Sequence, residues 1–344
     1  MKVLSVIGKI ALLILETLLL VVIGLYCIMF MICKGPSPSA KKLFVHSVKE
    51  TSALKFLPEI YLPKEEVDAI MNEGTEAEIE AMDTSLVNIS EEAQSSSDAD
   101  EWGYVDDDGD GIIIADVKGS TYSGYMMIVK DPKRVIVGCV TSRLGSRGYT
   151  VEEMVQRFGA VAGTNGGGFQ DDQGLGDGSL PDSMVIVNGK KYFYGTKNSF
   201  VGIDKDGILH VDCQNTNDIE KAGILWGCAY GPILVSNGKN VAPETEWSGL
   251  NPRTAIGQRS DGAILMLVID GRHVASLGAT VHDCAEVMLN FGAVNAGNMD
   301  GGSSALMYYK GEYVNNKAAV IGVRNIPTTW LVLPEGVKYD GKGE

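Results

Sequence analysis

NPRTAIGQRSDGAILMLVIDGR, residues 251–272, contains two apolar runs separated by Ser260-Asp261-Gly262. TAIGQ and AILMLVID have the length and composition of strands, and the Ser-Asp-Gly triplet is typical of a hairpin turn. Such a hairpin brings Arg253, at the start of the first strand, close to Asp270 and Arg272 at the end of the second. The stretch therefore predicts a β-rich fold with three charged residues at one end of a sheet.

Runs of the same kind recur between Gly and Asp turns from Gly111 to Leu333. Each run is short and rich in β-branched residues, which is the usual composition of a strand. The further predicted strands are GIIIADV, YMMIVK, RVIVGCV, SMVIV, FVGID, ILHVD, GPILVS and LVL.

Two stretches of this region carry clear helix signals. Thr150 precedes VEEMVQRF with Glu153 three residues on, and Thr280 precedes VHDCAEVMLNF with Asp283 three residues on. A Thr followed by an acidic residue at this spacing predicts a capping box, with Asp as the weaker form. A glycine follows each stretch, as at many helix ends. The fold class is therefore predicted to be α+β, with a mainly β body of mixed sheets and a few helices.

An apolar run of 24 residues, Ile10–Cys33, precedes this body and carries the single charge of Glu16. About 20 such residues suffice to cross the hydrocarbon core of a membrane as a helix. Lys2 and Lys9 precede the run, and positive charge collects on the cytoplasmic flank of membrane helices. The N-terminus is therefore expected in the cytoplasm and the C-terminal domain outside the cell, with the chain in the cell membrane as a single-pass protein.

A cleavable signal peptide is the alternative interpretation of this run. Its apolar region is shorter and ends in small residues. FMIC at 30–33 is bulky, and PSPSA at 36–40 is the one weak candidate for cleavage. The run is interpreted as an uncleaved anchor.

Three parts are expected along the chain. Residues 1–33 are the cytoplasmic tip and transmembrane anchor, 34–101 a stalk, and 102–344 the β-rich domain. The stalk contains enough apolar residues for one or two short helices before Glu73. From Glu73 to Glu101 it is acidic and Ser-rich, and such a composition buries too little apolar surface to offset its ordering entropy. This stretch is expected to be flexible.

The formal charge of −15 and the pI near 4.8 argue against a nucleic-acid partner, because phosphate binding relies on surface Lys and Arg. The cysteines give no CxxC spacing, so zinc ligation has no support and no metal role is assigned to the scattered histidines. If a disulfide forms outside the cell, Cys213 and Cys228 are the expected pair.

NAGNMDGGSSAL at 295–306 is the stretch with the most chemistry. Asn298 and Asp300 flank one residue and face the same side of an extended chain. Gly301-Gly302 then opens the backbone, and Ser303-Ser304 adds two hydroxyls. A carboxylate followed by exposed N–H groups and hydroxyls predicts a sugar or phosphate site. No Gly-x-Ser-x-Gly elbow is present, which argues against a serine hydrolase.

GTNGGGF at 163–169 places Asn165 before three glycines. Gly166 and Gly167 would let backbone N–H groups approach a ligand closely; a tight turn between strands is the alternative. Arg253 and Arg272 beside Asp270 would suit a phosphate held bidentately; a structural ion pair is the equal alternative.

Two acidic loops raise the question of a cation. DDDGDG at 106–111 places aspartates at the first, third and fifth positions of an EF-hand calcium loop. The twelfth position, which needs a Glu that binds calcium with both oxygens, is Val117, so a polar turn is predicted. QDDQGLGDG at 170–178 leaves a structural divalent cation open. No cofactor is expected.

Seven motifs in one order resemble the phosphodiester glycosidase family, whose best-known member is the "uncovering" enzyme that removes N-acetylglucosamine from mannose 6-phosphate diesters. They are GTNGGGF, PDSMVI, NPRTAIGQ, VIDGR, S-LGAT before a helix, NMDGGSS and VRNIPT, and the resemblance spans roughly Gly111–Leu333. Two departures stand out: Gly168 precedes Phe169 where the family has an aromatic directly, and Ser303 and Ala305 replace a glycine and a hydroxyl.

The resemblance implies a hydrolase that cleaves a sugar-1-phosphodiester in a cell-surface glycan, such as an exopolysaccharide. Asp300 or Asp270 would act as base or nucleophile at C1, as carboxylates do in glycosidases. The residues expected to bind the substrate are Arg253, Arg272, Asn165, Gly166, Gly167, Asn298, Gly301, Gly302, Ser303 and Ser304. A non-catalytic polysaccharide-binding module is the runner-up, and a phosphodiesterase cleaving P–O is a third possibility that usually needs two metal ions.

Overall fold

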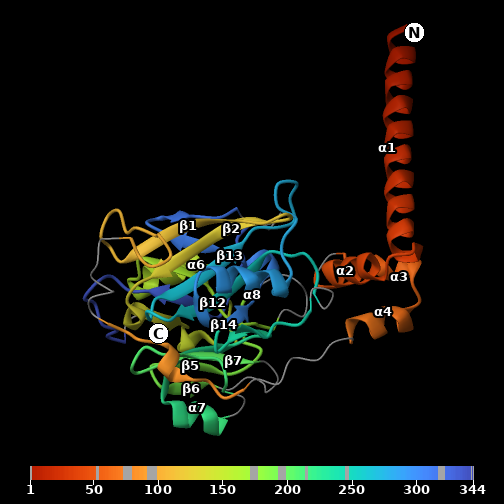
Figure 1. Cartoon of the computed structure of the whole chain (residues 1–344). Helices are drawn as coiled ribbons and strands as arrows, with labels where there is room; N and C mark the ends of the chain where they lie inside the picture. The colour runs from red at the N-terminus through yellow and green to blue at the C-terminus, as the bar shows by residue number, and fades with distance from the viewer. Residues whose placement is uncertain are drawn as a thin grey trace. The chain divides into compact units, whose positions relative to one another are not determined.

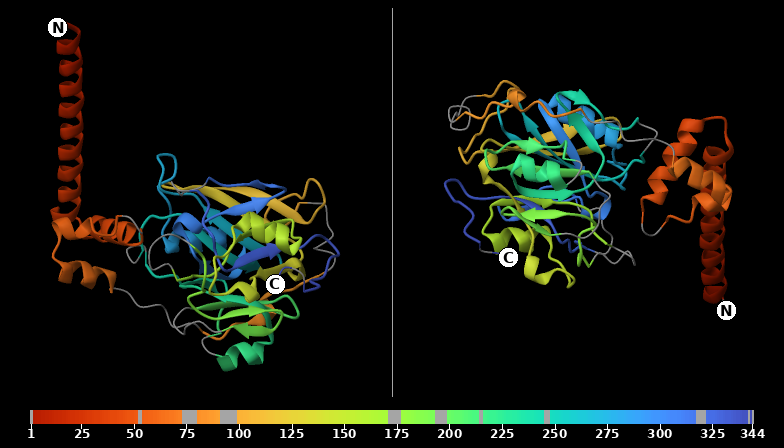
Figure 2. Two further views of the ribbon diagram at one scale, coloured as in Figure 1. Left: turned by 180° about the vertical axis from the view of Figure 1, so that it is seen from behind. Right: turned by 90° about the horizontal axis from the view of Figure 1, so that it is seen from below.

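The computed structural model describes residues 2–51, 54–72, 80–90, 99–170, 177–192, 199–213, 216–244, 248–316, 322–341 and 343. The chain divides into two units, Met1–Glu73 and Gly74–Glu344. Figures 1 and 2 show the first as helices and the second as a body of sheets with a few helices.

The first unit is built on helix α1 (Lys2–Lys34). Within it, Ile7–Lys34 has a mean hydropathy of 2.6 and is long and apolar enough to cross a membrane. A signal sequence near the N-terminus would meet the same criteria. Three short helices follow: α2 (Pro38–Lys49), α3 (Pro58–Tyr61) and α4 (Lys64–Met71). Cys33 at the end of α1 is buried in a small core with residues from after α1, namely Val45, Leu62, Val67 and Ile70.

Parts of the stretch expected to be flexible are attached to the second unit. The Met82 N–H donates to Asp212 at 3.0 Å, and the Asn88 N–H donates to the Ser260 carbonyl at 2.7 Å. The Asp100 carboxylate accepts from the buried Arg259 guanidinium at 2.6 Å. These polar contacts order residues 80–90 and 99–101 even though the composition offers little apolar burial. Residues 73–79 and 91–98 lie outside the described part of the chain.

Arg259 provides a stability test of this attachment. Its side chain, 2% exposed, pairs with Asp100 and Asp261 and lies 4.1 Å from the ring centroid of Trp102. Removing one partner of a fully buried ion pair costs about 3–5 kcal/mol, so for Arg259→Ala, with partly exposed carboxylates, we expect a loss of about 2–4 kcal/mol. Urea unfolding followed by tryptophan fluorescence measures it. Lys205→Ala, which breaks the solvent-exposed pair with Asp206, should change stability by under about 0.5 kcal/mol. Equal effects for both variants would contradict the expectation.

The largest sheet has seven strands in the order β1-β2-β13-β12-β14-β10-β11. Its strands are β1 (Ile112–Lys118), β2 (Ser123–Val129), β10 (Ile233–Ser236), β11 (Lys239–Asn240), β12 (Arg253–Arg259), β13 (Ile264–Ile269) and β14 (Ala293–Met299). β12 and β13 form the predicted antiparallel hairpin, with Arg253 opposite Ile269. β14, which the sequence patterns missed, pairs with the other edge of β12 and places Met299 opposite Thr254.

Two five-stranded antiparallel sheets complete the body, in the orders β16-β15-β4-β17-β3 and β6-β5-β9-β7-β8. The first contains β3 (Val135–Gly138), β4 (Ala162–Asn165), β15 (Met307–Tyr309), β16 (Glu312–Tyr313) and β17 (Thr329–Val332). The second contains β5 (Val185–Val187), β6 (Lys190–Tyr192), β7 (Phe200–Asp204), β8 (Leu209–His210) and β9 (Ile224–Ala229). All ten strands predicted from apolar runs are present.

The two predicted helices are confirmed as α6 (Val151–Phe158) and α8 (Val281–Asn290). Each begins with the expected reciprocal capping box, at Thr150 and Thr280. A third helix, α7 (Thr216–Ala222), lies on the sheet that contains β5 and β7 (Figure 1), where Ile219 is buried. The α+β class with a mainly β body is confirmed.

One apolar core joins the three sheets. It contains Met127 and Met266 of the seven-stranded sheet, Trp330 of β17, and Val185 and Val201 of the third sheet. The opposite face of the seven-stranded sheet is covered by α8. Strands from different sheets are therefore packed together. The end of β4 lies next to the end of β14, and the residues there are polar.

Candidate active site around Asp300

The turns that follow β4 and β14 are bonded to each other. The Asn165 Nδ2 donates to the Asp300 carbonyl at 2.5 Å, and the Asp300 N–H donates to the Gly166 carbonyl at 3.1 Å. The two motifs GTNGGGF and NMDGGSS thus form one site although they are more than 130 residues apart in the chain.

Asn165 is fully buried and uses its side chain to hold this junction. Besides donating to Asp300, its Oδ1 accepts from the Thr254 hydroxyl at 2.7 Å and from the Leu306 N–H at 3.3 Å. These contacts connect the ends of β4, β12 and β14. They support a positioning role for Asn165, one step removed from the substrate.

The glycines after Asn165 make backbone contacts within the protein. The Gly166 and Gly167 N–H groups donate to the carbonyl and the hydroxyl of Thr328, both at 3.0 Å. A Cβ on Gly167 would lie 2.6 Å from the Ala229 carbonyl oxygen. These positions need glycine because β-strand backbones approach closely here, and their N–H groups are already occupied in this structure.

Gly168, the residue that departs from the family pattern, has a separate reason to be glycine. A Cβ at this position would lie 2.8 Å from the Tyr230 ring and 2.9 Å from Asp182 Oδ2. Gly168 thus leaves room for an aromatic ring and a carboxylate beside the junction.

Asp300 carries the most unusual environment of the predicted residues. Its Oδ1 accepts from the Gly301 N–H at 3.0 Å, whereas its Oδ2 is buried and has no hydrogen-bond partner among the described residues. Asn298 Oδ1 is also buried without a partner there, and the buried Ser304 hydroxyl has the Asp300 carboxyl as its polar neighbour. We call Asn298, Asp300 and Ser304 the Asp300 trio. Because an unpaired buried polar atom is costly, such a group marks a place for bound water or a ligand.

Burial raises the pKa of Asp300 from its ordinary range to about 6. The nearby Ser304 hydroxyl, the Arg324 guanidinium and the Gly301 N–H oppose this shift, while the negative charge of Asp182 adds to it. A carboxyl group with a pKa near neutrality and a specific set of charged neighbours is a candidate for proton transfer or nucleophilic attack.

Asp182 and Arg324 are site residues that the sequence reasoning missed. Both lie inside motifs already singled out, PDSMVI and VRNIPT, and both act electrostatically on Asp300. The Arg324 guanidinium also lies 5.0 Å from the centroid of the Phe169 ring. Their side chains become part of the site only through folding, since each lies on a different loop from Asp300.

Asp270 is buried and surrounded by donors. Its Oδ1 accepts from Asn315 Nδ2 at 3.0 Å and from the Asn316 N–H at 3.1 Å, and its Oδ2 accepts from Asn316 Nδ2 at 2.9 Å. The carboxylate therefore holds the segment after β16. These contacts favour a positioning role over the catalytic role expected from the sequence.

The two arginines of the hairpin lie in different environments. The buried Arg253 donates to the carbonyls of Ala279 at 3.0 Å and Gly249 at 2.7 Å, and so supports the backbone before α8. Arg272 is exposed, has a positive φ of 62°, and donates to Asn251 Oδ1 at 3.0 Å and Ser303 Oγ at 3.4 Å. Of the two, Arg272 is the one brought to the turn that follows Asp300.

That turn, η5 (Gly302–Ser304), depends on its glycines. The Gly302 N–H donates to the Pro252 carbonyl at 2.8 Å, and Gly302 has a φ of +59°. A Cβ on Gly301 would lie 2.6 Å from the same carbonyl oxygen. The Gly-Gly pair therefore lets the chain reverse tightly between Asp300 and the two serines.

The expected polar turn at 106–111 is present. Asp106 accepts from the N–H groups of Gly109 and Gly111 and pairs with Lys130 at 3.1 Å. Asp110 pairs with Lys310 at 3.2 Å. Two lysines thus offset part of the acidic charge of this turn. The second acidic loop, 170–178, falls largely on residues 171–176, which lie outside the described residues.

All six cysteines lie in the described part of the chain and are free thiols. The expected Cys213–Cys228 pair is therefore not formed in this structure. Cys228 lies in the large core and contacts Met299 Sδ at 3.8 Å, whereas Cys213 packs in the small core around α7.

Comparison with known proteins bears on this geometry. The phosphodiester glycosidase family model matches residues 158–333. N-acetylglucosamine-1-phosphodiester alpha-N-acetylglucosaminidase from Bos taurus is 28% identical over 194 residues, covering 51% of this chain and 35% of its own. The prophage-derived protein YomE of Bacillus subtilis is 32% identical over 193 residues, covering 54% and 30%. The chain thus spans about a third of the length of these relatives.

Among solved structures, the fold is similar to the zebrafish N-acetylglucosamine-1-phosphodiester alpha-N-acetylglucosaminidase catalytic domain auto-inhibited by its pro-peptide. The TM-score is 0.52 at 21% identity, covering 65% of this chain and 82% of that one. The matched family region contains Asp182, Arg253, Asp270, Arg272, Asn298, Asp300, Ser304 and Arg324.

Proposed function

The chain belongs to the phosphodiester glycosidase family, and from that premise we propose that it hydrolyses a sugar-1-phosphodiester of the N-acetylglucosamine-1-phosphate type in a cell-surface glycan. The observation that carries this proposal is the Asp300 trio, in which Asp300 Oδ2, Asn298 Oδ1 and the Ser304 hydroxyl are buried within seven residues of sequence. Asp300 Oδ2 and Asn298 Oδ1 have no hydrogen-bond partner among the described residues. Such a group can bind sugar hydroxyls and present a carboxylate to the anomeric carbon.

In the proposed reaction, water supplies the oxygen that ends on C1, and the C1–O bond breaks. The phosphomonoester leaves with the electron pair and is already a stable anion, so its protonation matters less than its charge. Asp300, ionised above its pKa of about 6, either takes the proton from the attacking water or attacks C1 itself before water releases the sugar. The two routes invert and retain the anomeric configuration, respectively.

Cations around Asp300 suit the phosphate. Arg324 acts electrostatically on Asp300, and Arg272 reaches the serine turn that follows it. A guanidinium holds phosphate oxygens bidentately. We assign phosphate binding to Arg324 and Arg272, hydroxyl binding to Asn298 and Ser304, and the second carboxylate of the site to Asp182.

We propose that α1 anchors this enzyme in a membrane, with the body outside the cell. The support comes from the first unit, because Cys33 at the end of α1 is buried against residues from the segments after it. A cleaved signal sequence would take that part of the small core away. Mean hydropathy and length alone are compatible with both roles.

Oxygen-18 water tests the proposed function. Full-length protein in detergent is incubated with a synthetic GlcNAc-1-phosphodiester, and the products are analysed by mass spectrometry. We expect free sugar carrying the label on C1 and unlabelled phosphate. Label in the phosphate would mean P–O cleavage, and glycan binding without sugar release would mean a non-catalytic module; either result would overturn the proposal.

The pH profile is a second expected outcome. Burial raises the pKa of Asp300 to about 6, and the proposed reaction needs the ionised carboxylate. kcat/KM should therefore be nearly constant above pH 7 and fall about tenfold per pH unit below pH 6, since it reports the free enzyme. A rise in activity on acidification through pH 6 would mean that the protonated form of a carboxyl group is required instead.

A further inference from the structure

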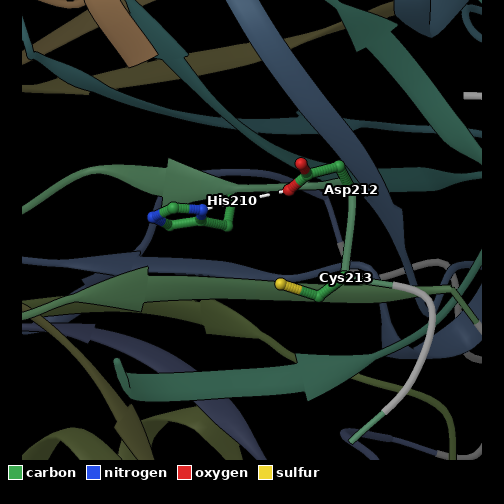
Figure 3. A group of neighbouring side chains, drawn as sticks. All are labelled: His210, Asp212 and Cys213. Carbon is green, nitrogen blue, oxygen red and sulfur yellow. Dashed lines mark ion pairs between the residues drawn. The ribbon is translucent and has the colours of Figure 1, made fainter. Parts of the chain in front are cut away.

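A cleft of about 490 Å³ lies between α7, the end of β8 and the segment around Met82. Its lining includes His210, Asp212 and Cys213, which offer a nitrogen, an oxygen and a sulfur (Figure 3). These three ligand atoms all lie within 4.8 Å of one another. The proposed glycosidase reaction uses none of these residues.

His210 is held in the orientation of a metal ligand. Its Nε2 lies 2.9 Å from Asp204 Oδ2, across the β7–β8 hairpin. With the ring proton donated from Nε2 to this carboxylate, the lone pair is on Nδ1, which lies 3.9 Å from Asp212 Oδ1. Metal-binding histidines almost always donate their other N–H to a carboxylate, carbonyl or water in this way, which fixes the tautomer and the ring orientation.

The other two side chains are also held in place. Asp212 Oδ2 accepts from the Met82 N–H at 3.0 Å, which turns Oδ1 toward His210. Cys213 is 4% exposed and packs with Ile219 of α7 in the small core of the third sheet. Neighbours from three separate segments, around residues 82, 204 and 219, therefore fix a nitrogen, an oxygen and a sulfur donor close together.

We infer that His210, Asp212 and Cys213 form a binding site for a divalent transition-metal ion, with Zn²⁺ as the ion of best fit. Zinc accepts N, O and S donors at about 2.0–2.3 Å, which puts neighbouring ligands of a tetrahedral site roughly 3.3–3.6 Å apart. The 3.9 Å between His210 Nδ1 and Asp212 Oδ1 needs only a small adjustment to reach that spacing. The distances to Cys213 Sγ are at most 4.8 Å and need a change of up to about 1.3 Å. A thiolate disfavours Mg²⁺ and Ca²⁺, which prefer oxygen ligands. The cleft that these residues line has room for a water molecule as the fourth ligand.

The site would join two parts of the body. Asp212 already binds the backbone of Met82, and His210 already binds Asp204 at the end of β7. A metal bound to Asp212 and His210 would therefore tie the segment around residues 80–90 to the third sheet. The simpler alternative is that the Asp204–His210 pair stabilises the β7–β8 hairpin without any metal.

Cobalt substitution decides between these two. Full-length protein in detergent is freed of any polyhistidine tag, stripped with a chelator and titrated with Co²⁺ and then Zn²⁺. We expect one equivalent of Co²⁺ with a thiolate-to-cobalt charge-transfer band and the intense visible bands of a tetrahedral site, both removed by Zn²⁺. At free Zn²⁺ about 100 times the Kd, the melting temperature should rise by about 5 °C or more. A wild-type spectrum without a thiolate band would overturn the inference, whatever the variants do.

Variants then identify the ligands. Cys213→Ala should lose the charge-transfer band, and Cys284→Ala, which removes another buried free thiol from α8, should keep it. Asp204→Asn retains the Oδ1 acceptor for the N–H groups of Asp206 and Ile208 but cannot accept from His210. It should bind Co²⁺ about 10–100-fold more weakly with the same spectrum. A charge-transfer band that survives in Cys213→Ala would place the metal elsewhere and contradict the assignment.

Discussion

Asp300→Asn is expected to lower kcat/KM for a sugar-1-phosphodiester by about 10²–10⁴-fold if Asp300 is the general base, and by more if it is the nucleophile. The amide keeps the shape of the side chain and its acceptor for the Gly301 N–H. It removes the charge and the basic oxygen that the reaction needs. Initial rates of sugar release measure the effect. Asp116→Asn, on the exposed part of β1, is the matched control and should retain full activity.

The same variant should be more stable relative to wild type at high pH than at low pH. Burial raises the pKa of Asp300 to about 6 in the folded state, above the value of about 3.9 for an unfolded chain. The protonated carboxyl therefore favours folding below pH 4, and this contribution is lost as the pH rises through 6. At pH 7–8 the ionised Asp300 therefore lowers the free energy of unfolding of the wild-type protein by about 2–3 kcal/mol relative to low pH. Asp300→Asn has no carboxyl group to ionise here and should not lose this stability. Melting curves of both proteins at pH 5 and pH 8 measure this difference in stability.

For the activity prediction, an Asp300→Asn variant that retains more than a tenth of wild-type activity would remove Asp300 from the mechanism.

Asp270→Asn is expected to act mainly on stability. Three N–H groups of Asn315 and Asn316 converge on this buried carboxylate, and an amide would turn an NH₂ toward one of them. Leaving buried donors unpaired in this way should cost about 2–4 kcal/mol. Urea unfolding measures the loss, with Asp116→Asn again as the control.

Kinetics below the unfolding transition separate a positioning role of Asp270 from a catalytic one. As a positioning residue, Asp270→Asn should keep at least tenfold more activity than Asp300→Asn and the same fall in kcat/KM below pH 6. Activity as low as that of Asp300→Asn, in a variant that is still folded, would show that Asp270 takes part in the reaction.

Local patterns were sufficient for much of the fold. The β12–β13 hairpin, the capping boxes at Thr150 and Thr280, and every strand predicted from an apolar run are present. Such features depend on residues a few positions apart, so short windows of sequence contain their causes. β14 was missed because AVNAGNM is rich in small and polar residues, and only its pairing with β12 and β10 makes it a strand.

By itself, then, the sequence determined the apolar helix, the β-rich body and the family, because the first two depend on short windows of residues and the third on seven short motifs in a fixed order. It also predicted a role for Asp300 from the motif NMDGGSS. Tertiary structure decided the environments of the side chains, on which the proposed roles rest. In the folded chain both carboxylate oxygens of Asp270 accept hydrogen bonds, whereas Asp300 Oδ2 has no partner among the described residues. Folding also places the charges of Asp182 and Arg324 near enough to shift the pKa of Asp300. It also placed Asp204 behind His210. Whether a polar atom is paired, and what its pKa is, depends on neighbours from distant segments, and those neighbours exist only once the chain has folded.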